Sequence, residues 1–219
     1  MRKLYTILYV CFMTLYADES SLLIKAINVL DRFMVISEER IPPKLLRQAG
    51  AIAIIPDMIK GGVIVGARYG KGVLLIRQYR GWSDPLFIRM YGGSLGWQIG
   101  LESIDIVLIF HDAKSALEIL DHSITLGADL SIAVGPLGRD LSAATNLKFK
   151  AKIYSYSKTM GVYAGIALAG AKLEVDYEAN QRFYHCEPTK FYRILQGKCH
   201  NDNPYIQILK RKLMEYVKW

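Results

Sequence analysis

The chain has 219 residues and carries 28 Lys and Arg residues against 20 Asp and Glu residues, a formal net charge of +8 at pH 7. Hydrophobic residue types make up 52% of the sequence and charged types 22%, a balance that excludes a disordered chain, a coiled coil and a collagen-like rod. The length suits one domain, or two at most. Such a chain can bury a core large enough to fold without disulfides or bound metal ions.

The N-terminal residues have the layout of a secretory signal peptide. Arg2 and Lys3 are followed by an uncharged run up to Ala17 and then by Asp18. We therefore expect residues 1–17 to direct export and to be cleaved. Lipidation at Cys11 and a retained N-terminal helix remain open as alternatives. The uncharged stretches of the remaining chain are all shorter than the roughly 20 residues that span a bilayer, so we expect no transmembrane helix.

Export would limit the classes of partner that a basic domain can meet. An exported protein does not meet nucleic acid routinely, so we expect no nucleic-acid partner. Anionic phospholipid head groups are the acidic partner available at an envelope membrane. The expected location is periplasmic or outer-membrane-associated.

Two cysteines follow the signal peptide, Cys186 and Cys199. In an oxidising compartment they are expected to pair in a disulfide that closes a short loop. Two alternatives stay open. The thiols remain free, or they bind zinc together with His185 and His200, although zinc sites usually have two or more residues between ligands.

Helices are predicted at both ends of the chain. Apolar side chains recur at helical spacing in residues 20–37, and residues 44–48 suit one short helical turn. After Pro188 the tail returns to helix. Residues 204–219 are amphipathic, with the basic run 210–212 largely on the polar side.

The middle of the chain has the pattern of a sheet, because short apolar runs alternate with glycine turns. Residues 63–68 and 73–77 are predicted to form a hairpin across a turn at residues 69–72. Residues 95–101 are predicted to form one strand with a bulky face and a nearly bare glycine face. The other predicted strands are residues 51–55, 86–91, 104–111, 130–135, 147–157, 162–169 and 173–175.

The order of these elements predicts the fold class. Asp112 is expected to cap a short helix over residues 113–120. Since strands follow one another with few helices between them, the sheet is expected to be antiparallel or barrel-like. The prediction is an α+β fold, in which N- and C-terminal helices flank a β-rich core in a single domain over residues 18–219.

Catalytic motifs are weak. Residues 66–72 lack the Lys-[Ser/Thr] ending of a phosphate loop, and a strand rather than a helix is predicted after residues 92–96. His111 and Asp112 are not accompanied by a Gly-x-Ser-x-Gly elbow. We expect neither an enzyme, nor a cofactor, nor a metal.

A stripe of basic and aromatic side chains is the clearest binding signal. Residues 147–158 alternate in character, with apolar side chains on one face of the predicted strand. The opposite face carries Lys148, Lys150, Lys152, Tyr154, Tyr156 and Lys158. Lysines near an anionic membrane contribute about 1 kcal/mol each, and tyrosine suits the interface. A solvated face or a lysine-protected edge strand is the alternative.

A second basic group lies near the N-terminal helix. Lys25 and Arg32 are on that helix, and Lys44 and Arg47 follow it. An amphipathic helix beside basic residues can lie in a membrane interface. Packing of this helix on the sheet is the alternative.

A series of glycine-rich motifs resembles the SYLF domain family. The segments that resemble it keep the family's order over roughly residues 20–186: residues 41–42, 49–56, 61–66, 70–73, 82–85, 92–100, 125–130, 135–139, 154–157, 161–165 and 179–184. The resemblance implies a non-enzymatic lipid-binding domain. Eukaryotic members bind phosphoinositides and take part in actin regulation, and bacterial members are exported or associated with the outer membrane. It also implies Lys25, Arg32, Lys44 and Arg47 as lipid contacts.

Three functions are compatible with these observations. The first is binding of anionic phospholipid at a bacterial envelope membrane. The second is a protein-interaction scaffold, including actin binding in a eukaryotic host. The third is transport of a small lipid inside a barrel.

Overall fold

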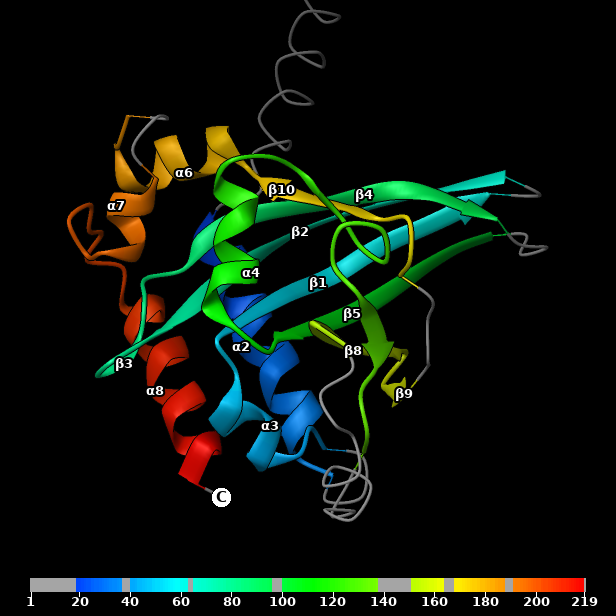
Figure 1. The fold of residues 1–219 in the computed structure, drawn as a ribbon, viewed down its shortest axis with the longest axis horizontal. Coiled ribbons are helices and arrows are strands. Elements are labelled where there is room, and N and C mark those ends of the chain that lie inside the picture. Colours follow the sequence, from blue (N-terminus) through cyan, green and yellow to red (C-terminus); the bar gives the residue numbers. More distant parts are fainter. Residues whose placement is uncertain are drawn as a thin grey trace, which may run out of the picture.

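A long, curled sheet runs through the centre of the molecule (Figure 1). The structure is a computed structural model that describes residues 19–36, 40–62, 65–95, 100–137, 151–163, 168–187 and 191–218. Its strands are β1 (Ala51–Gly62), β2 (Val65–Gln78), β3 (Gly81–Trp82), β4 (Leu86–Leu95), β5 (Gly100–Phe110), β6 (Ile124–Thr125), β7 (Ile132–Val134), β8 (Ile153–Thr159), β9 (Val162–Tyr163) and β10 (Lys172–Val175).

The strand order is β6-β10-β4-β2-β1-β5-β8-β7, with β3 beside β2 and β9 beside β8. Strand pairing is antiparallel except between β7 and β8. Since β6 and β7 stand at the two ends of this order, the described strands form an open sheet rather than a closed barrel. The predicted α+β class is confirmed.

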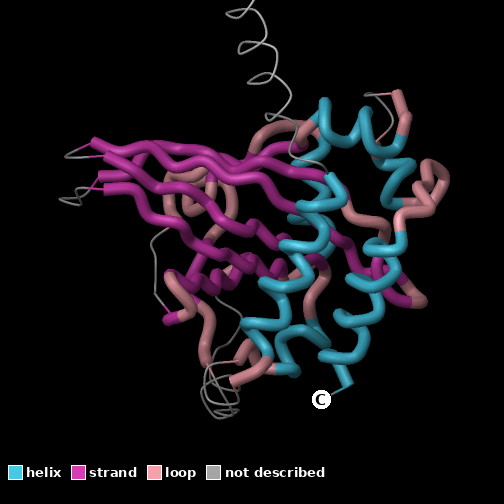
Figure 2. Tube along the Cα trace, turned by 180° about the vertical axis from the view of Figure 1, so that it is seen from behind, coloured by secondary structure: helices cyan, strands magenta, loops and turns pink. Residues whose placement is uncertain are grey.

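Helices cover both faces of the sheet. They are α2 (Glu19–Met34), α3 (Pro43–Gln48), α4 (Ala113–Leu117) with the 3₁₀ turn η1 (Glu118–Leu120), α6 (Tyr177–Tyr184), α7 (Tyr192–Leu195) and α8 (Pro204–Lys218). From behind, α2 and α8 lie in front of the strands, whereas α4 lies on the opposite face (Figures 1 and 2). None of the described helices is long and apolar enough to cross a bilayer.

Local sequence explains the helices at the ends and the cap between them. In α2 the side chains of Leu23, Leu30 and Phe33 are completely buried, as their helical spacing predicts. At the start of α4, the Asp112 carboxylate accepts a hydrogen bond from the backbone N–H of Ser115, so the predicted cap is confirmed.

The environment of Asp112 also shifts its pKa. Burial alone would raise the pKa of Asp112. The hydrogen bonds from Ser115 and from a lysine outweigh burial and lower it.

The predicted hairpin turn at residues 69–72 is wrong. β2 runs unbroken through these residues, and its hairpin partner is β1. Gly70 and Gly72 instead allow close approach, because the pairing of β1 shifts register around Asp57. A Cβ at Gly72 would lie 2.3 Å from the carbonyl oxygen of Ile54.

The prediction of one strand over residues 95–101 is also wrong. Leu95 ends β4 and Gly100 begins β5, and β2 and β1 lie between these two strands in the sheet. The chain therefore reverses direction between Leu95 and Gly100. Residues 96–99 lie outside the described part of the chain.

The C-terminal third is held together by a disulfide. Cys186, which follows α6, is bonded to Cys199, with the two Cα atoms 6.3 Å apart and a sequence separation of 13. The described residues contain no group of three or more His, Cys, Asp or Glu side chains placed to hold a metal ion.

Helix α6 was not predicted from the spacing of apolar side chains, although its residues belong to one of the SYLF-like motifs.

Candidate functional site

The predicted basic and aromatic stripe is not an exposed face. Lys148 and Lys150 lie outside the described residues. Lys152 is exposed, but its Nζ lies 3.1 Å from Asp112 Oδ2 in an ion pair. Tyr154 and Tyr156 are buried.

The rest of β8 is buried because neighbouring strands and a helix cover it. The Tyr156 hydroxyl donates to the carbonyl oxygen of Pro136 at 3.1 Å, and burial raises its pKa well above the usual value. Lys158 is only 3% exposed. Its Nζ donates to the carbonyl oxygen of Arg32 at 3.1 Å and lies 5.4 Å from the ring centre of Phe33. The exposure predicted for these side chains is therefore wrong.

The two basic residues of α2 are neutralised by acids. Lys25 Nζ lies 2.9 Å from Asp57 Oδ2. The Arg32 guanidinium lies 2.5 Å from Asp105 Oδ2. Both carboxylates belong to the sheet, so these pairs fasten α2 over β1 and β5, as the packing alternative expects.

Lys44 and Arg47 have a different environment on α3. Arg47 is exposed and donates to the carbonyl oxygen of Val217 at 3.1 Å, near the end of α8. Among the described residues, neither Lys44 nor Arg47 forms an ion pair with an acid. Their charges are therefore available to a partner.

Two further cations lie at the same end of the molecule. The turn between β2 and β3 exposes Arg80 next to Tyr79, whose side chain is 99% exposed. A Cβ at Gly81 would lie 3.9 Å from Met214 Sδ, so this turn adjoins α8. Exposed Arg211 is one helical turn before Met214. We call Lys44, Arg47, Arg80 and Arg211 the cationic end.

A half-buried arginine, Arg77, joins these elements. The Arg77 guanidinium donates to the carbonyl oxygens of Leu46 at 2.5 Å and Ala49 at 3.3 Å, and it lies 4.0 Å from the ring centre of Trp82. Burial lowers the pKa of Arg77. Because it joins α3 to β2 and faces Trp82, Arg77 positions the cationic end rather than adding to its free charge.

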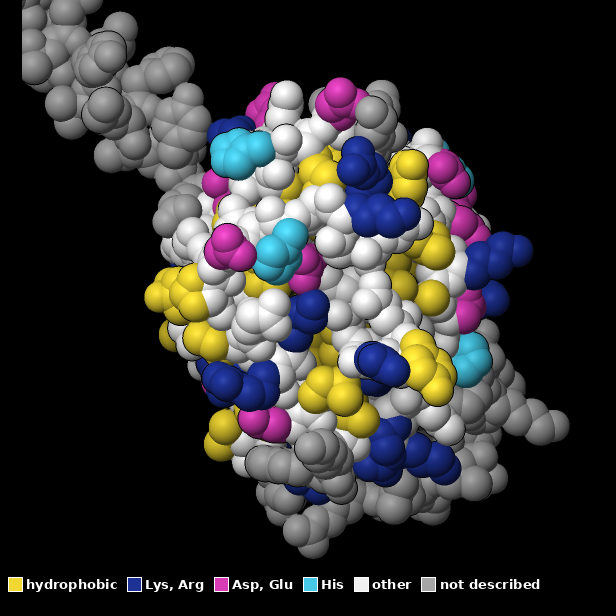
Figure 3. All heavy atoms as spheres, turned by 90° about the vertical axis from the view of Figure 1, so that its left-hand side faces the viewer, with side chains coloured by type: hydrophobic (Ala, Val, Ile, Leu, Met, Phe, Trp, Pro, Cys, Tyr) yellow, Lys and Arg dark blue, Asp and Glu magenta, His cyan; other side chains and the backbone are white. Residues whose placement is uncertain are grey.

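Few acids oppose the cationic end. Glu215 is the single acidic residue in α3, α8 and the turn between β2 and β3. Lys210 and Lys212 also lie on α8, but they pair with Asp84 at 2.8 Å and Asp31 at 2.7 Å. Figure 3 faces the side of the molecule that carries β3 and α8, where Lys and Arg side chains lie beside apolar ones. Lys44, Arg47, Arg80 and Arg211 therefore form a local group of cations with little acid beside it.

The sequence alone pointed to three of the four residues of the cationic end. Lys44 and Arg47 were predicted lipid contacts, and Arg211 lay in a basic helical run. Arg80 was missed because the turn between β2 and β3 was not predicted. The pair Arg80-Gly81, with Gly81 at a φ of 136°, is the local signal of that turn.

Comparison with known proteins identifies similar chains. A family model described as Ysc84, a Las17-binding protein actin regulator, matches residues 91–216, from β4 to α8. The SH3 domain-containing YSC84-like protein 1 of Xenopus laevis is 35% identical over 181 residues, which are 80% of this chain and 54% of that protein.

Two further relatives show the same partial overlap. The human SH3 domain-containing YSC84-like protein 1 is 36% identical over 180 residues, 79% of this chain and 52% of its own length. The LAS seventeen-binding protein 3 of Saccharomyces cerevisiae is 32% identical over 187 residues, 82% of this chain and 40% of its own length. The chain thus spans about half the length of the animal relatives.

Proposed function

The chain belongs to the Ysc84 family, also called the SYLF family, and on that premise we propose that it is a non-catalytic module that binds anionic phospholipid surfaces through its cationic end. The observation that carries this proposal is the separation of paired from unpaired cations. Within the described part of the chain, Lys25, Arg32 and Lys152 pair with acids, whereas the four side chains of the cationic end do not.

The physical chemistry of this end suits a membrane surface. Each Lys or Arg near an anionic leaflet contributes about 1 kcal/mol, and the attraction decays within a Debye length of about 8 Å at physiological salt. Tyr79 lies beside Arg80 at the tip of the turn, with an apolar ring and a polar hydroxyl. Such a side chain is typical of the interface between head groups and hydrocarbon.

Co-sedimentation of the purified protein with vesicles tests the proposal. We expect binding to vesicles that contain phosphatidylglycerol, weak binding to pure phosphatidylcholine vesicles, and loss of the difference at high salt. Equal binding to both vesicle types at low salt would contradict electrostatic recognition of the head groups.

The proposed compartment is the bacterial periplasm or the outer-membrane surface. The charge layout of residues 1–17, which lie outside the described part of the chain, supports export. Mass spectrometry of the mature protein tests it. An N-terminus at Asp18 is expected, and a mature chain that begins at Met1 would contradict cleavage.

A second candidate is a protein-interaction scaffold. It is favoured by the family description, which names an actin regulator, and by the yeast relative, which is named for binding LAS seventeen. Pelleting of the protein with actin filaments tests this candidate. Binding to filaments that survives high salt, together with no preference for anionic vesicles, would favour it over the membrane proposal.

A further inference from the structure

A buried carboxylate lies between a lysine and a histidine at the border of the cationic end. Asp84 follows β3, and its side chain is only 4% exposed. Its Oδ1 lies 2.8 Å from Lys210 Nζ on α8, and its Oδ2 lies 2.9 Å from His200 Nδ1 in the segment between α7 and α8. Because Arg80 precedes β3 and Arg211 follows Lys210, this cluster adjoins two of the four residues of the cationic end.

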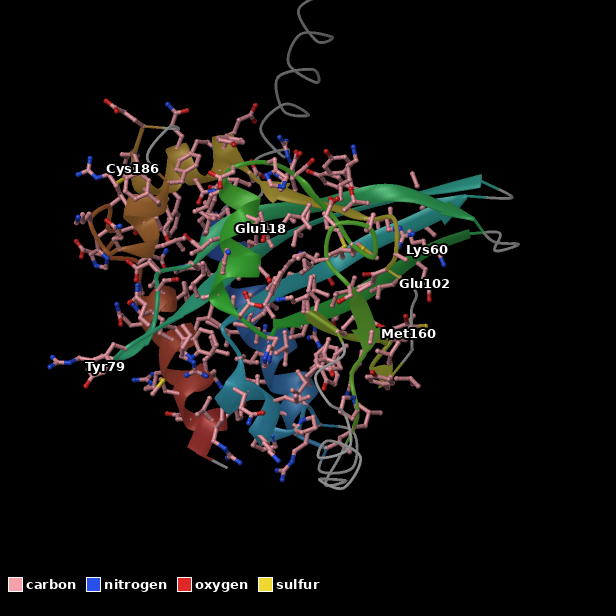
Figure 4. The ribbon with its side chains drawn as sticks, viewed as in Figure 1. Lys60, Tyr79, Glu102, Glu118, Met160 and Cys186 are labelled. Atoms are coloured by element: carbon pink, nitrogen blue, oxygen red, sulfur yellow. A yellow bond between two sulfur atoms is a disulfide. The ribbon has the colours of Figure 1, made fainter. Side chains whose placement is uncertain are left out.

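Both neighbours of His200 in the sequence are tied to α6. Cys199 forms the disulfide with Cys186, which follows α6 and is labelled in Figure 4. On the other side, the Asn201 side-chain amide donates to the carbonyl oxygen of Phe183 at 2.6 Å. Since the chain is anchored one residue before and one residue after the histidine, its ring is held in place against the buried carboxylate.

The second ring nitrogen of His200 also faces a carboxylate. Nε2 lies 3.5 Å from Oδ1 of Asp202, whose side chain is fully exposed. A neutral imidazole has one N–H and one bare nitrogen, so one of these nitrogens would turn a lone pair toward a carboxylate oxygen. The imidazolium donates from both nitrogens and suits both contacts. The ring is half-exposed, so it exchanges protons with solvent while it keeps these contacts.

Two further groups face this cluster across Asp84. Lys210 supplies one positive charge, and Tyr184 supplies a hydroxyl from α6. Burial, together with the charge of Asp84, raises the pKa of Tyr184 well above its usual value, so this tyrosine stays neutral. Asp84 and Asp202 against Lys210 therefore leave one net negative charge while the histidine is neutral, and none once it is protonated.

We propose that protonation of His200 strengthens binding of the cationic end to anionic phospholipid and so makes membrane binding sensitive to mild acid. This inference rests on the proposed function. Histidine ordinarily gains its proton between about pH 5 and pH 8. The proton removes a net negative charge next to the elements that carry Arg80 and Arg211, where it would otherwise repel the phosphates.

Vesicle binding at two pH values tests the inference on the purified protein. The phosphodiester of phosphatidylglycerol keeps its charge over this range, so a change in affinity comes from the protein. From about pH 7.5 to about pH 5.5, the affinity of the parent is expected to rise about fivefold more than that of His200→Gln, which corresponds to about 1 kcal/mol for one charge near the leaflet. Glutamine still donates a hydrogen bond to Asp84, so this variant is expected to fold.

Two further variants sharpen the test. His122→Gln is the matched control, because it removes an exposed histidine outside this cluster, and it is expected to keep the acid response of the parent. His200→Arg carries a permanent positive charge. At about pH 7.5 it is expected to bind about fivefold more tightly than the parent, and its response to acid is expected to match that of His200→Gln.

The outcomes separate this inference from the proposed function. Equal acid responses of the parent and His200→Gln would overturn the inference even though both bind anionic vesicles. An equal loss of the response in His122→Gln would show that only net charge matters and would overturn it as well. The same holds for a His200→Arg variant that is folded by circular dichroism but binds no more tightly than the parent at neutral pH. Absence of binding by the parent at both pH values would instead contradict the proposed function, and the inference would fall with it.

Discussion

Removal of all four residues of the cationic end in one variant tests the membrane proposal most directly. Lys44, Arg47, Arg80 and Arg211 are replaced by Ala together. At about 1 kcal/mol for each cation near an anionic leaflet, the loss is about 4 kcal/mol, on the order of 1,000-fold in partitioning at low salt. The fold is expected to survive, because the described contact that the variant loses is the hydrogen bond of Arg47 to Val217, worth about 1 kcal/mol.

A matched control removes the same net charge from elsewhere. Lys25, Arg89, Lys152 and Arg182 are replaced by Ala in a second variant. Each of these cations lies in an ion pair with a carboxylate, and the partners are Asp57, Glu174, Asp112 and Glu19. Partly exposed pairs contribute at most about 1 kcal/mol each, so this variant is also expected to fold. Its membrane binding is expected to fall much less than that of the first variant.

The assay is co-sedimentation with phosphatidylglycerol vesicles at several salt concentrations. The first variant is expected to lose both affinity and salt dependence, whereas the control keeps most of both. Equal losses in the two variants would show that only the net charge matters and would refute a localised binding surface. Circular dichroism and size-exclusion chromatography confirm that both variants are folded.

Three further predictions concern stability. Gly72→Ala is expected to lower the free energy of unfolding in urea by about 1–3 kcal/mol, because a Cβ there would lie 2.3 Å from a backbone oxygen, whereas Gly93→Ala, with open space, serves as control. Replacement of Cys186 and Cys199 by Ser is expected to cost about 3 kcal/mol, and equal stability of the parent with and without reductant would contradict this. The pKa of Asp112 lies below its usual value of 3.8, so its ionised form stabilises the fold above that pH and the effect is lost as pH falls through the folded-state pKa. The advantage of the parent over Asp112→Asn is therefore expected at neutral pH and should shrink in acid, and a constant difference in urea midpoints would contradict it.

Short-range sequence patterns were sufficient for several elements. Helices α2 and α8 follow from the spacing of apolar side chains, and Asp112 is a local cap signal for α4. Each depends on residues within a few positions of one another. The SYLF-like motifs identified the family because their order along the chain is itself a sequence property.

The candidate surfaces required the three-dimensional arrangement. A lysine and its acid can be far apart in sequence, as Lys25 and Asp57 are, so the sequence does not show which cations are neutralised. Arg80 and Arg211 are brought to the same end only because the turn between β2 and β3 packs against α8. The prediction of an exposed stripe on β8 failed for a related reason, since alternation along a strand does not reveal that both faces of that strand are covered.

The sequence by itself determined the helical ends, the β-rich middle and the family, because these depend on local spacing and on the order of motifs. Only the tertiary structure decided that Gly72 lies within a strand and that Lys44, Arg47, Arg80 and Arg211 lie at the same end of the molecule. Glycine is equally compatible with a turn and with close packing of two backbones. The choice is made by the strand that packs beside it, here β1 at Ile54, which lies far enough along the chain that no local pattern records it.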